Sequence, residues 1–206
     1  MQGWLSNGST DAPITLILAH GAGAPMDSPF MNTVAEALGG DHLRVARFEF
    51  PYMAARRDNN HRRAPDHEPV LLDAWRQAVA RWSGARTLII GGKSLGGRIA
   101  SMVADELGVA GLVCLGYPFH PPGNPQRARV KHLEAMRTPA LIVQGTRDSF
   151  GRPDEVAAYH LSKQVRFKWI EDGDHSFKPR ARSGRTAAGN LEEAIAHVRA
   201  FCDHLC

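Results

Sequence analysis

Residues 87–100 read TLIIGGKSLGGRIA, and the middle of this stretch fits two incompatible chemistries. In a phosphate-binding loop, Lys93 and Ser94 would hold nucleotide phosphates and a magnesium ion. In a nucleophile motif, Ser94 would instead stand on a sharp turn between a strand and a helix. The residues on either side of this pair decide between the two, and with them the fold.

A phosphate-binding loop needs a glycine five residues before its Gly-Lys pair, so that a flexible loop follows the strand. Thr87 occupies that position, and the apolar residues after it continue as a buried strand, which leaves no loop to wrap a phosphate. The pattern G-x-S-x-G fits through Gly92, Ser94 and Gly96, with a strand before it and a helix-compatible run, 98–107, after it. The stretch therefore predicts Ser94 as a nucleophile.

The two glycines of this pattern have a steric purpose. A serine at the apex of a strand-to-helix turn is strained, commonly with a positive φ, and its two flanking elements pass very close together. Glycines two residues before and two residues after the serine leave out the Cβ atoms that would collide there.

Apolar segments rich in β-branched residues alternate with helix-compatible segments along the whole chain. The expected strands cover 14–20, 43–50, 87–92, 110–117, 139–145 and 165–171. The expected helices cover 29–38, 69–82, 95–107, 129–136, 154–161 and 190–205. Strands that are apolar throughout are buried on both faces, which favours a mainly parallel sheet with helices on each side. We predict one doubly wound α/β domain over 1–206, with a polar loop at 51–66.

The composition argues against several classes of protein. The chain has 206 residues, 43% of them hydrophobic, and a formal net charge of +4. The first ten residues lack the pattern of a secretory signal, and no apolar run approaches the length of a membrane span. No nucleic-acid-binding module surrounds the basic clusters, so we expect no nucleic-acid partner. Three cysteines without metal-ligand spacing indicate a reducing, cytoplasmic setting. The oligomeric state stays open.

A serine hydroxyl needs a base to become a nucleophile, and the base needs an acid to orient it. In parallel sheets such groups gather beyond the carboxyl ends of the strands. The segment GTRD puts Asp148 after the fifth expected strand, and GDH puts His175 after the sixth. The resulting chain order of Ser94, Asp148 and His175 is the one that this motif uses.

Other histidines and carboxylates compete for these roles. Of the ten histidines, only His175 follows the last expected strand, whereas His20 and His120 end earlier strands and are candidates for lining a pocket. Asp172 and Asp174 lie too close in sequence to His175 to reach the far side of its ring, and we interpret them as turn formers.

Attack on a carbonyl puts negative charge on its oxygen, and backbone N–H groups must already point at that oxygen. Leu95 follows the nucleophile at a helix N-terminus, where amides are unpaired. The glycine-containing loop at 20–29, HGAGAPMDSP, is expected to supply a second donor. The residues that we expect to contact substrate are Gly21, Gly23, Lys93, Tyr117 and His120.

Five segments carry a resemblance to a known family: LILAHGAGAPMDSP, GGKSLGGR, GYPFHPPG, GTRD and GDHSFKPR. Together they resemble the α/β-hydrolase superfamily, and more narrowly its small, capless, dienelactone-hydrolase-like branch, which includes a hydrolase-like subunit of a eukaryotic histone-acetyltransferase complex. The resemblance implies Ser94 as nucleophile, His175 as base, Asp148 as acid, and the amides of Ala22 and Leu95 as oxyanion hole. Few residues precede the first expected strand, so we expect the sheet to be shortened at that edge.

These residues predict a serine hydrolase that cleaves an ester, thioester or related acyl bond of a small molecule, with no metal or organic cofactor. The alternative is a non-catalytic interaction domain that has kept the fold, since fold alone does not secure function. The complete set of catalytic residue types in the correct order favours the enzyme.

Two basic segments, 55–65 and 177–185, begin on the side of the sheet where the catalytic residues are expected. If their side chains overhang the pocket, they favour a substrate that carries a carboxylate or phosphate away from the scissile bond. If they are solvated, they are ordinary surface. The residues concerned are Arg56, Arg57, Arg62, Arg63, Lys178, Arg180 and Arg182.

Overall fold

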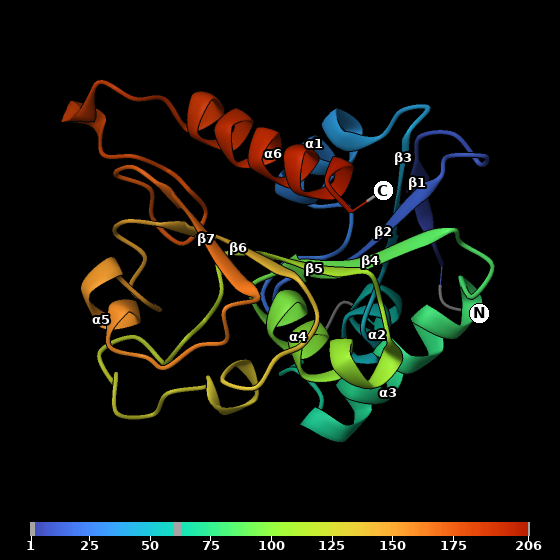
Figure 1. The fold of residues 1–206 in the computed structure, drawn as a ribbon, viewed down its shortest axis with the longest axis horizontal. Helices are drawn as coiled ribbons and strands as arrows, with labels where there is room; N and C mark the ends of the chain where they lie inside the picture. The colour runs from blue at the N-terminus through green and yellow to red at the C-terminus, as the bar shows by residue number, and fades with distance from the viewer. Residues whose placement is uncertain (1–2, 60–62, 206) are drawn as a thin grey trace.

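The computed structural model describes residues 3–59 and 63–205. Its strands form one sheet in the order β1-β3-β2-β4-β5-β6-β7, in which only β1 runs antiparallel to its neighbour (Figure 1). The strands are β1 Leu5–Asn7, β2 Ile14–Ala19, β3 Leu43–Phe48, β4 Thr87–Lys93, β5 Gly111–Leu115, β6 Ala140–Gly145 and β7 Val165–Ile170. The predicted mainly parallel sheet is confirmed.

Helices lie on both faces of this sheet, as expected. Figure 1 shows α1 and α6 on one face and α2, α3 and α4 on the other. The helices are α1 Pro29–Leu38, α2 Pro51–Asn59, α3 Glu68–Arg81, α4 Leu95–Leu107, α5 Pro153–Ala157 and α6 Ala187–Asp203, with short 3-10 turns η1 Lys131–Leu133 and η2 Ala181–Ser183.

Burial on both faces explains why the central strands β2, β5 and β6 are largely apolar. Every residue of β2 is buried. Leu16 and Leu18 pack into the cluster beneath α1 and α6, whereas Ile17 and Ala19 pack into the cluster on the α2 to α4 side. Because successive side chains of a strand point to opposite faces, a strand covered on both sides needs an apolar residue at each position.

The first edge of the sheet is short. β1 has three residues and pairs antiparallel with β3, with Ser6 opposite Ala46. The sequence predicts shortening at this edge from the few residues that precede β2, and the three-residue strand agrees with that prediction.

The prediction of a loop at 51–66 is wrong in its first part, which forms α2. Tyr52 and Met53 of this helix are buried in the core. Asp66 Oδ2 accepts a hydrogen bond from the Tyr52 N–H at 2.8 Å, which satisfies an amide that has no partner within the helix. Polar residues in the second half of the helix mask this pattern in the sequence.

The prediction of a helix at 129–136 is also wrong, because only the 3-10 turn η1 forms there. The buried apolar residues of the segment 129–136 are Val130, Leu133 and Met136. A spacing of three residues matches the three-residue period of a 3-10 turn better than the 3.6-residue period of an α-helix. The helix expected at 154–161 is likewise shorter, as α5.

The strand order places two loops beside each other. The chain passes from β2 to β3 on one side and then returns to β4 on the other side of β2. Ala19 and Gly92 are partners at the carboxyl ends of β2 and β4, so the loops that follow these strands are neighbours. Ligand sites of open α/β sheets lie at such a reversal of strand order.

None of the helices in the described part of the chain combines the length and apolar character that crossing a membrane requires.

Candidate active site

Ser94 stands on the sharp turn between β4 and α4 that the sequence predicts. Its φ is 50° and its ψ is −112°, a strained conformation for a residue with a side chain. A Cβ atom at Gly92 would lie 2.2 Å from the carbonyl oxygen of Ala19, and one at Gly96 would lie 2.3 Å from the same atom. Both glycines are therefore required by the close approach of β2.

A continuous series of hydrogen bonds joins three side chains from three loops. The Ser94 Oγ lies 2.8 Å from His175 Nε2, and His175 Nδ1 lies 2.7 Å from Asp148 Oδ2. With Asp148 ionised, the ring donates from Nδ1 and accepts from the Ser94 hydroxyl at Nε2. Asp148 is fully buried, and the side chain of His175 is 25% exposed.

Asp148 accepts hydrogen bonds at both carboxylate oxygens. Its Oδ1 accepts from the Phe150 N–H at 2.9 Å, and its Oδ2 also accepts from Gln144 Nε2 at 2.9 Å. Gln144 is itself fully buried on β6, and its Oε1 accepts from the Tyr117 N–H at 2.7 Å. Sequence reasoning missed Gln144, although a lone amide at the end of an apolar strand was the available signal.

Lys93, a predicted substrate contact, lines the cavity next to Ser94, and its ammonium group holds the backbone of His175. The Nζ atom donates to the His175 carbonyl oxygen at 2.7 Å and lies 5.7 Å from the ring centroid of Phe30. Burial lowers the pKa of Lys93 to about 8, against the opposing influence of Asp148 and Asp174. The lysine thus ties the turn after β4 to the loop after β7.

The loop after β2 is fixed from beneath by two core side chains. His20 Nδ1 donates to the Gly21 carbonyl oxygen at 2.7 Å, and its Nε2 accepts from the Phe50 N–H at 3.1 Å. Burial lowers the pKa of His20, which agrees with a neutral ring whose two nitrogens have opposite roles. The Tyr52 hydroxyl donates to the Ala22 carbonyl oxygen at 3.1 Å. The backbone at 21–22 is therefore held rigidly beside Ser94.

A cavity of about 330 Å³ opens at Ser94. The ring of Phe150 lies 4.4 Å from that of His175, centroid to centroid, and forms part of the wall. The apolar walls of the cavity, formed by Phe30, Met31 and Phe150, were not predicted from the sequence. The complete lining is Gly21, Ala22, Gly23, Ala24, Ser28, Phe30, Met31, Lys93, Ser94, Phe150, His175 and Ser176.

Two predicted substrate contacts lie away from this cavity. Tyr117 is fully buried on the α4 side of the sheet, and its hydroxyl donates to the Arg129 carbonyl oxygen at 2.9 Å. His120 is 1% exposed, and its Nε2 lies 3.3 Å from a Glu155 carboxylate oxygen. Gly116, which precedes Tyr117, is in the left-handed conformation, with φ at 68°.

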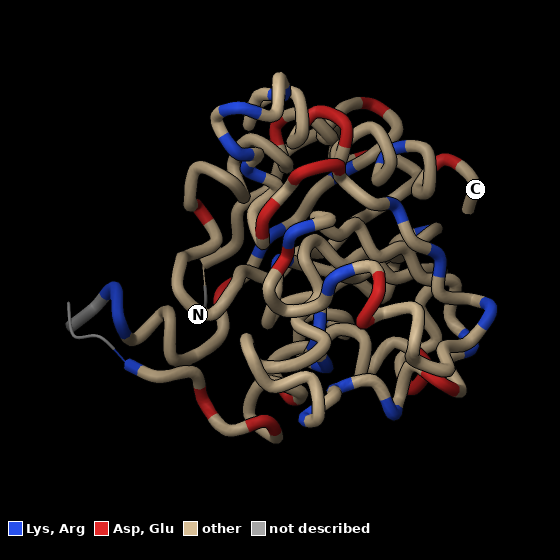
Figure 2. The backbone as a smooth tube through the Cα atoms, turned by 90° about the vertical axis from the view of Figure 1, so that its left-hand side faces the viewer, with Lys and Arg blue, Asp and Glu red and all other residues tan. Residues whose placement is uncertain are grey.

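Two arginines of the basic segments form ion pairs with carboxylates outside the cavity. Arg57 makes two hydrogen bonds to Glu49 and a third to Asp27, and Arg180 pairs with Asp172. In Figure 2 the basic residues at the end of α2 lie on a part of the chain that projects from the body of the molecule. Arg62 lies outside the described residues. None of the described arginines lines the cavity at Ser94.

Among residues 3–59 and 63–205, no group of three or more His, Cys, Asp or Glu side chains is arranged to hold a metal ion. Over the same residues, no inserted cap domain stands above the cavity.

Comparison with known proteins agrees with this architecture. A serine hydrolase homologue from Coxiella burnetii is 21% identical, with a TM-score of 0.69 over 98% of this chain and 89% of its own. A lidless α/β serine hydrolase from Xanthomonas campestris is 21% identical, with a TM-score of 0.65 over 98% of this chain and 86% of its own. The dienelactone hydrolase of Anabaena variabilis is 20% identical, with a TM-score of 0.70 over 98% and 90%. These likenesses establish the fold.

The family is established by sequence. A family model described as an alpha/beta hydrolase domain matches residues 12–203, which is nearly the whole chain. The narrower resemblance to a histone-acetyltransferase subunit stays a prediction. This chain belongs to the alpha/beta hydrolase family, and the part of it that the structure describes holds no inserted cap domain.

Proposed function

We propose that this protein is a serine hydrolase that cleaves a small ester or thioester through an acyl-enzyme on Ser94. The observation that carries the proposal is the unbroken series of hydrogen bonds from Ser94 Oγ through the ring of His175 to Asp148. Nucleophile, base and orienting acid in this geometry form the arrangement used for acyl transfer on several unrelated folds.

In the first half of the reaction, Ser94 Oγ attacks the carbonyl carbon of the substrate while His175 Nε2 takes the hydroxyl proton. Asp148 keeps the imidazole in the required tautomer and stabilises the imidazolium that forms. The tetrahedral intermediate then expels the alcohol or thiol, which takes the proton from His175 Nε2. The acyl group remains on Ser94 as an ester.

In the second half, a water molecule attacks the acyl carbon and gives a proton to His175 Nε2. The collapse of the second intermediate releases the carboxylic acid and returns that proton to Ser94 Oγ. The base is regenerated, and one water is consumed for each acyl bond cleaved.

The negative charge on the carbonyl oxygen needs donors that are already oriented. The Leu95 amide is the first of α4, where N–H groups lack partners within the helix and the helix dipole favours an anion. The Ala22 amide belongs to the loop that lines the cavity and is held by Tyr52 and His20. We assign these two amides to the oxyanion hole.

The cavity favours a small acyl group of largely apolar character. Its volume of about 330 Å³ is at the lower end of the range for small-molecule sites, roughly 300–1,000 Å³. Lys93 is the cation of the lining, and its ammonium is already bonded to the backbone of His175. None of the described residues of the two basic segments lines this cavity. These segments therefore give little support to an anionic group on the acyl side of the substrate.

Hydrolysis of p-nitrophenyl acetate and butyrate tests the proposal. We expect the native protein to hydrolyse both, and Ser94→Ala to lose at least about 10³-fold in kcat/KM. The double variant Ser94→Ala/His175→Ala should be no less active than the single one, because the residues act as a unit.

Ser176→Ala is the matched control, since Ser176 lines the same cavity but contacts neither His175 Nε2 nor Asp148 through its hydroxyl. It should retain the activity. Undiminished hydrolysis by Ser94→Ala would show that the reaction does not use this serine.

A further inference from the structure

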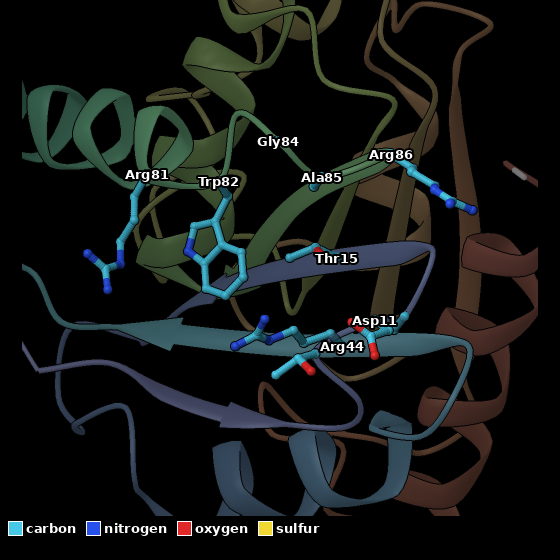
Figure 3. Close-up of a pocket in the computed structure, with 10 residues that line it drawn as sticks. Asp11, Thr15, Arg44, Arg81, Trp82, Gly84, Ala85 and Arg86 are labelled. Atoms are coloured by element: carbon cyan, nitrogen blue, oxygen red, sulfur yellow. The ribbon is translucent and has the colours of Figure 1, made fainter.

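Figure 3 shows a second cavity, of about 560 Å³. Thr15 and Arg86 in its lining lie at the amino ends of β2 and β4, whereas Ser94 follows the carboxyl end of β4. The cavity opens at the amino ends of β2, β3 and β4. Because β4 is a seven-residue strand, the two cavities are separated by about 20 Å along it. We call it the arginine cavity, and its lining is Thr10, Asp11, Ala12, Thr15, Arg44, Arg81, Trp82, Gly84, Ala85 and Arg86.

The arginine cavity carries an excess of positive charge. Three guanidinium groups and one carboxylate line it, which leaves two positive charges in excess. Over the described residues, the side chains of Arg81 and Arg86 make no ion pair and no hydrogen bond, and the Arg44 guanidinium uses only its Nε, which donates to Ser6 Oγ at 2.9 Å. Most of the N–H donors of these arginines are thus available to a ligand.

Two of the three arginines are oriented by tryptophans. The guanidinium carbon of Arg44 lies 4.4 Å from the ring centroid of Trp82, and that of Arg81 lies 5.7 Å from that of Trp4. The two indole rings contact each other, with centroids 5.8 Å apart. Figure 3 shows Arg44 and Arg81 near Trp82, whereas Arg86 points away from it.

These cation–π contacts orient the two arginines before a ligand binds. A guanidinium that packs its flat face on an indole keeps its N–H edge free for hydrogen bonds. Holding the side chain in one orientation beforehand also lowers the entropy that a ligand would otherwise lose in ordering it. A planar fork of donors fits the oxygens of a phosphate, and the guanidinium groups of Arg44 and Arg81 together carry the two positive charges that match a dianion.

The other side chains of the lining supply acceptors. Asp11 carries a carboxylate, and Thr10 and Thr15 carry hydroxyls that accept as well as donate. A ligand with hydroxyl groups next to its phosphate would use both kinds of partner. The volume is within the range of small-molecule sites, roughly 300–1,000 Å³.

We propose that the arginine cavity binds a small hydroxylated phosphate monoester, whose phosphate lies against the guanidinium groups of Arg44 and Arg81. This site is separate from the site of acyl transfer, and it does not depend on the function proposed there.

Titration calorimetry with glycerol 3-phosphate tests this inference, with tryptophan emission as a second measurement because Trp82 and Trp4 lie beside Arg44 and Arg81. We expect saturable binding that weakens as salt is added. Arg81→Gln should raise Kd at least about tenfold, the usual consequence of losing a charge-assisted hydrogen bond. Hydrolysis of p-nitrophenyl butyrate by this variant should be unchanged.

Arg166→Gln is the matched control, because Arg166 is an exposed arginine on β7 that lies outside the cavity. It should bind glycerol 3-phosphate like the native protein. Arg81 is an exposed residue in the last turn of α3, so its replacement leaves the core intact, and circular dichroism checks the fold of each variant. Equal weakening in Arg81→Gln and Arg166→Gln, or an absence of saturable binding by the native protein, would overturn the proposal. Binding of inorganic sulfate as tight as that of glycerol 3-phosphate would reduce the site to a general anion site and also refute it.

Discussion

At the scale of single residues, the acid of the proposed triad depends on a neighbour that carries no charge. Gln144 donates to Asp148 Oδ2, the same oxygen that accepts from His175 Nδ1. It also donates to the Tyr117 carbonyl oxygen and accepts from the Tyr117 amide. Gln144 is therefore a positioning residue, which orients the carboxylate toward the imidazole.

Replacing Gln144 with methionine tests this role. The variant keeps the volume but loses a charge-assisted hydrogen bond to Asp148, which is worth about 1.5–3 kcal/mol. We expect kcat for p-nitrophenyl butyrate to fall by roughly 10- to 100-fold, with KM nearly unchanged. Steady-state kinetics and the free energy of unfolding are measured on the same samples.

Gln77→Met is the matched control, because Gln77 lies on the exposed face of α3 and bonds only to the side chain of Asp73. It should leave kcat unchanged. A Gln144→Met protein that is less stable but retains its kcat would assign Gln144 to the core alone.

At the scale of elements, the turn between β4 and α4 depends on how closely β2 approaches it. Adding a Cβ at Gly96 puts an atom 2.3 Å from the Ala19 carbonyl oxygen, so backbone must move. We expect Gly96→Ala to lower the free energy of unfolding by about 1–3 kcal/mol and to reduce hydrolysis. Urea denaturation measures the first quantity.

Gly23→Ala provides the comparison, because a Cβ there meets no atom within 4 Å although Gly23 lines the same cavity. It should leave the stability unchanged. Equal stability of the two variants would mean that the approach of β2 does not require the glycine.

The packing of η1 against α4 predicts a sensitivity to acid. His132 Nε2 lies 2.8 Å from Ser101 Oγ on α4, and burial, with a smaller effect of the Arg98 charge, lowers the pKa of His132 from 6.5 to about 4. Between these values the unfolded chain binds more protons at this residue than the folded one, so stability is lost as the pH falls from 6.5 to 4.

His132→Gln should remove part of this loss, about 1–2 kcal/mol between pH 7 and pH 4 once solvent screening of a partly exposed side chain is allowed for. Urea denaturation at the two pH values measures it. His42→Gln, at an exposed histidine, is the control and should resemble the native protein. An acid response of His132→Gln that equals the native one would contradict the assignment.

The elements also show what a sequence can and cannot predict. β2 and β4 are predictable because burial on both faces makes them largely apolar. α2 is not, because its second half is polar and its start is completed by Asp66, which lies in the segment after the helix. The site divides in the same way. The turn at Ser94 follows from local glycines, whereas the sequence marks Gln144 only as a polar residue at the end of an apolar strand, and its partners Tyr117 and Asp148 are known only from the structure.

At the scale of the whole molecule, the sheet separates two sites. The carboxyl ends of the strands present Ser94, His175 and Asp148, and the amino ends present the arginine cavity. No inserted cap domain covers the first site in the described chain, and under the proposed function the walls of the cavity would limit the acyl group.

These walls predict a preference for short acyl chains. Phe30 lines the cavity and packs against Phe177, with ring centroids 5.9 Å apart. We expect kcat/KM to be higher for p-nitrophenyl butyrate than for the octanoate, and Phe30→Ala to reverse or remove this difference by enlarging the cavity. Hydrolysis of the acetate is the internal control and should change little. A native preference for octanoate would contradict the proposed limit on size.

The most direct test of the central claim is labelling by a fluorophosphonate, followed by mass spectrometry of the peptide that carries the adduct. Such reagents react rapidly only with a serine that a base activates beside an oxyanion hole. We predict one adduct on Ser94 in the native protein and in Ser176→Ala, and none in Ser94→Ala. Labelling of Ser94→Ala to the same extent as the native protein, or a native protein that stays unlabelled, would contradict the claim and favour a non-catalytic interaction domain.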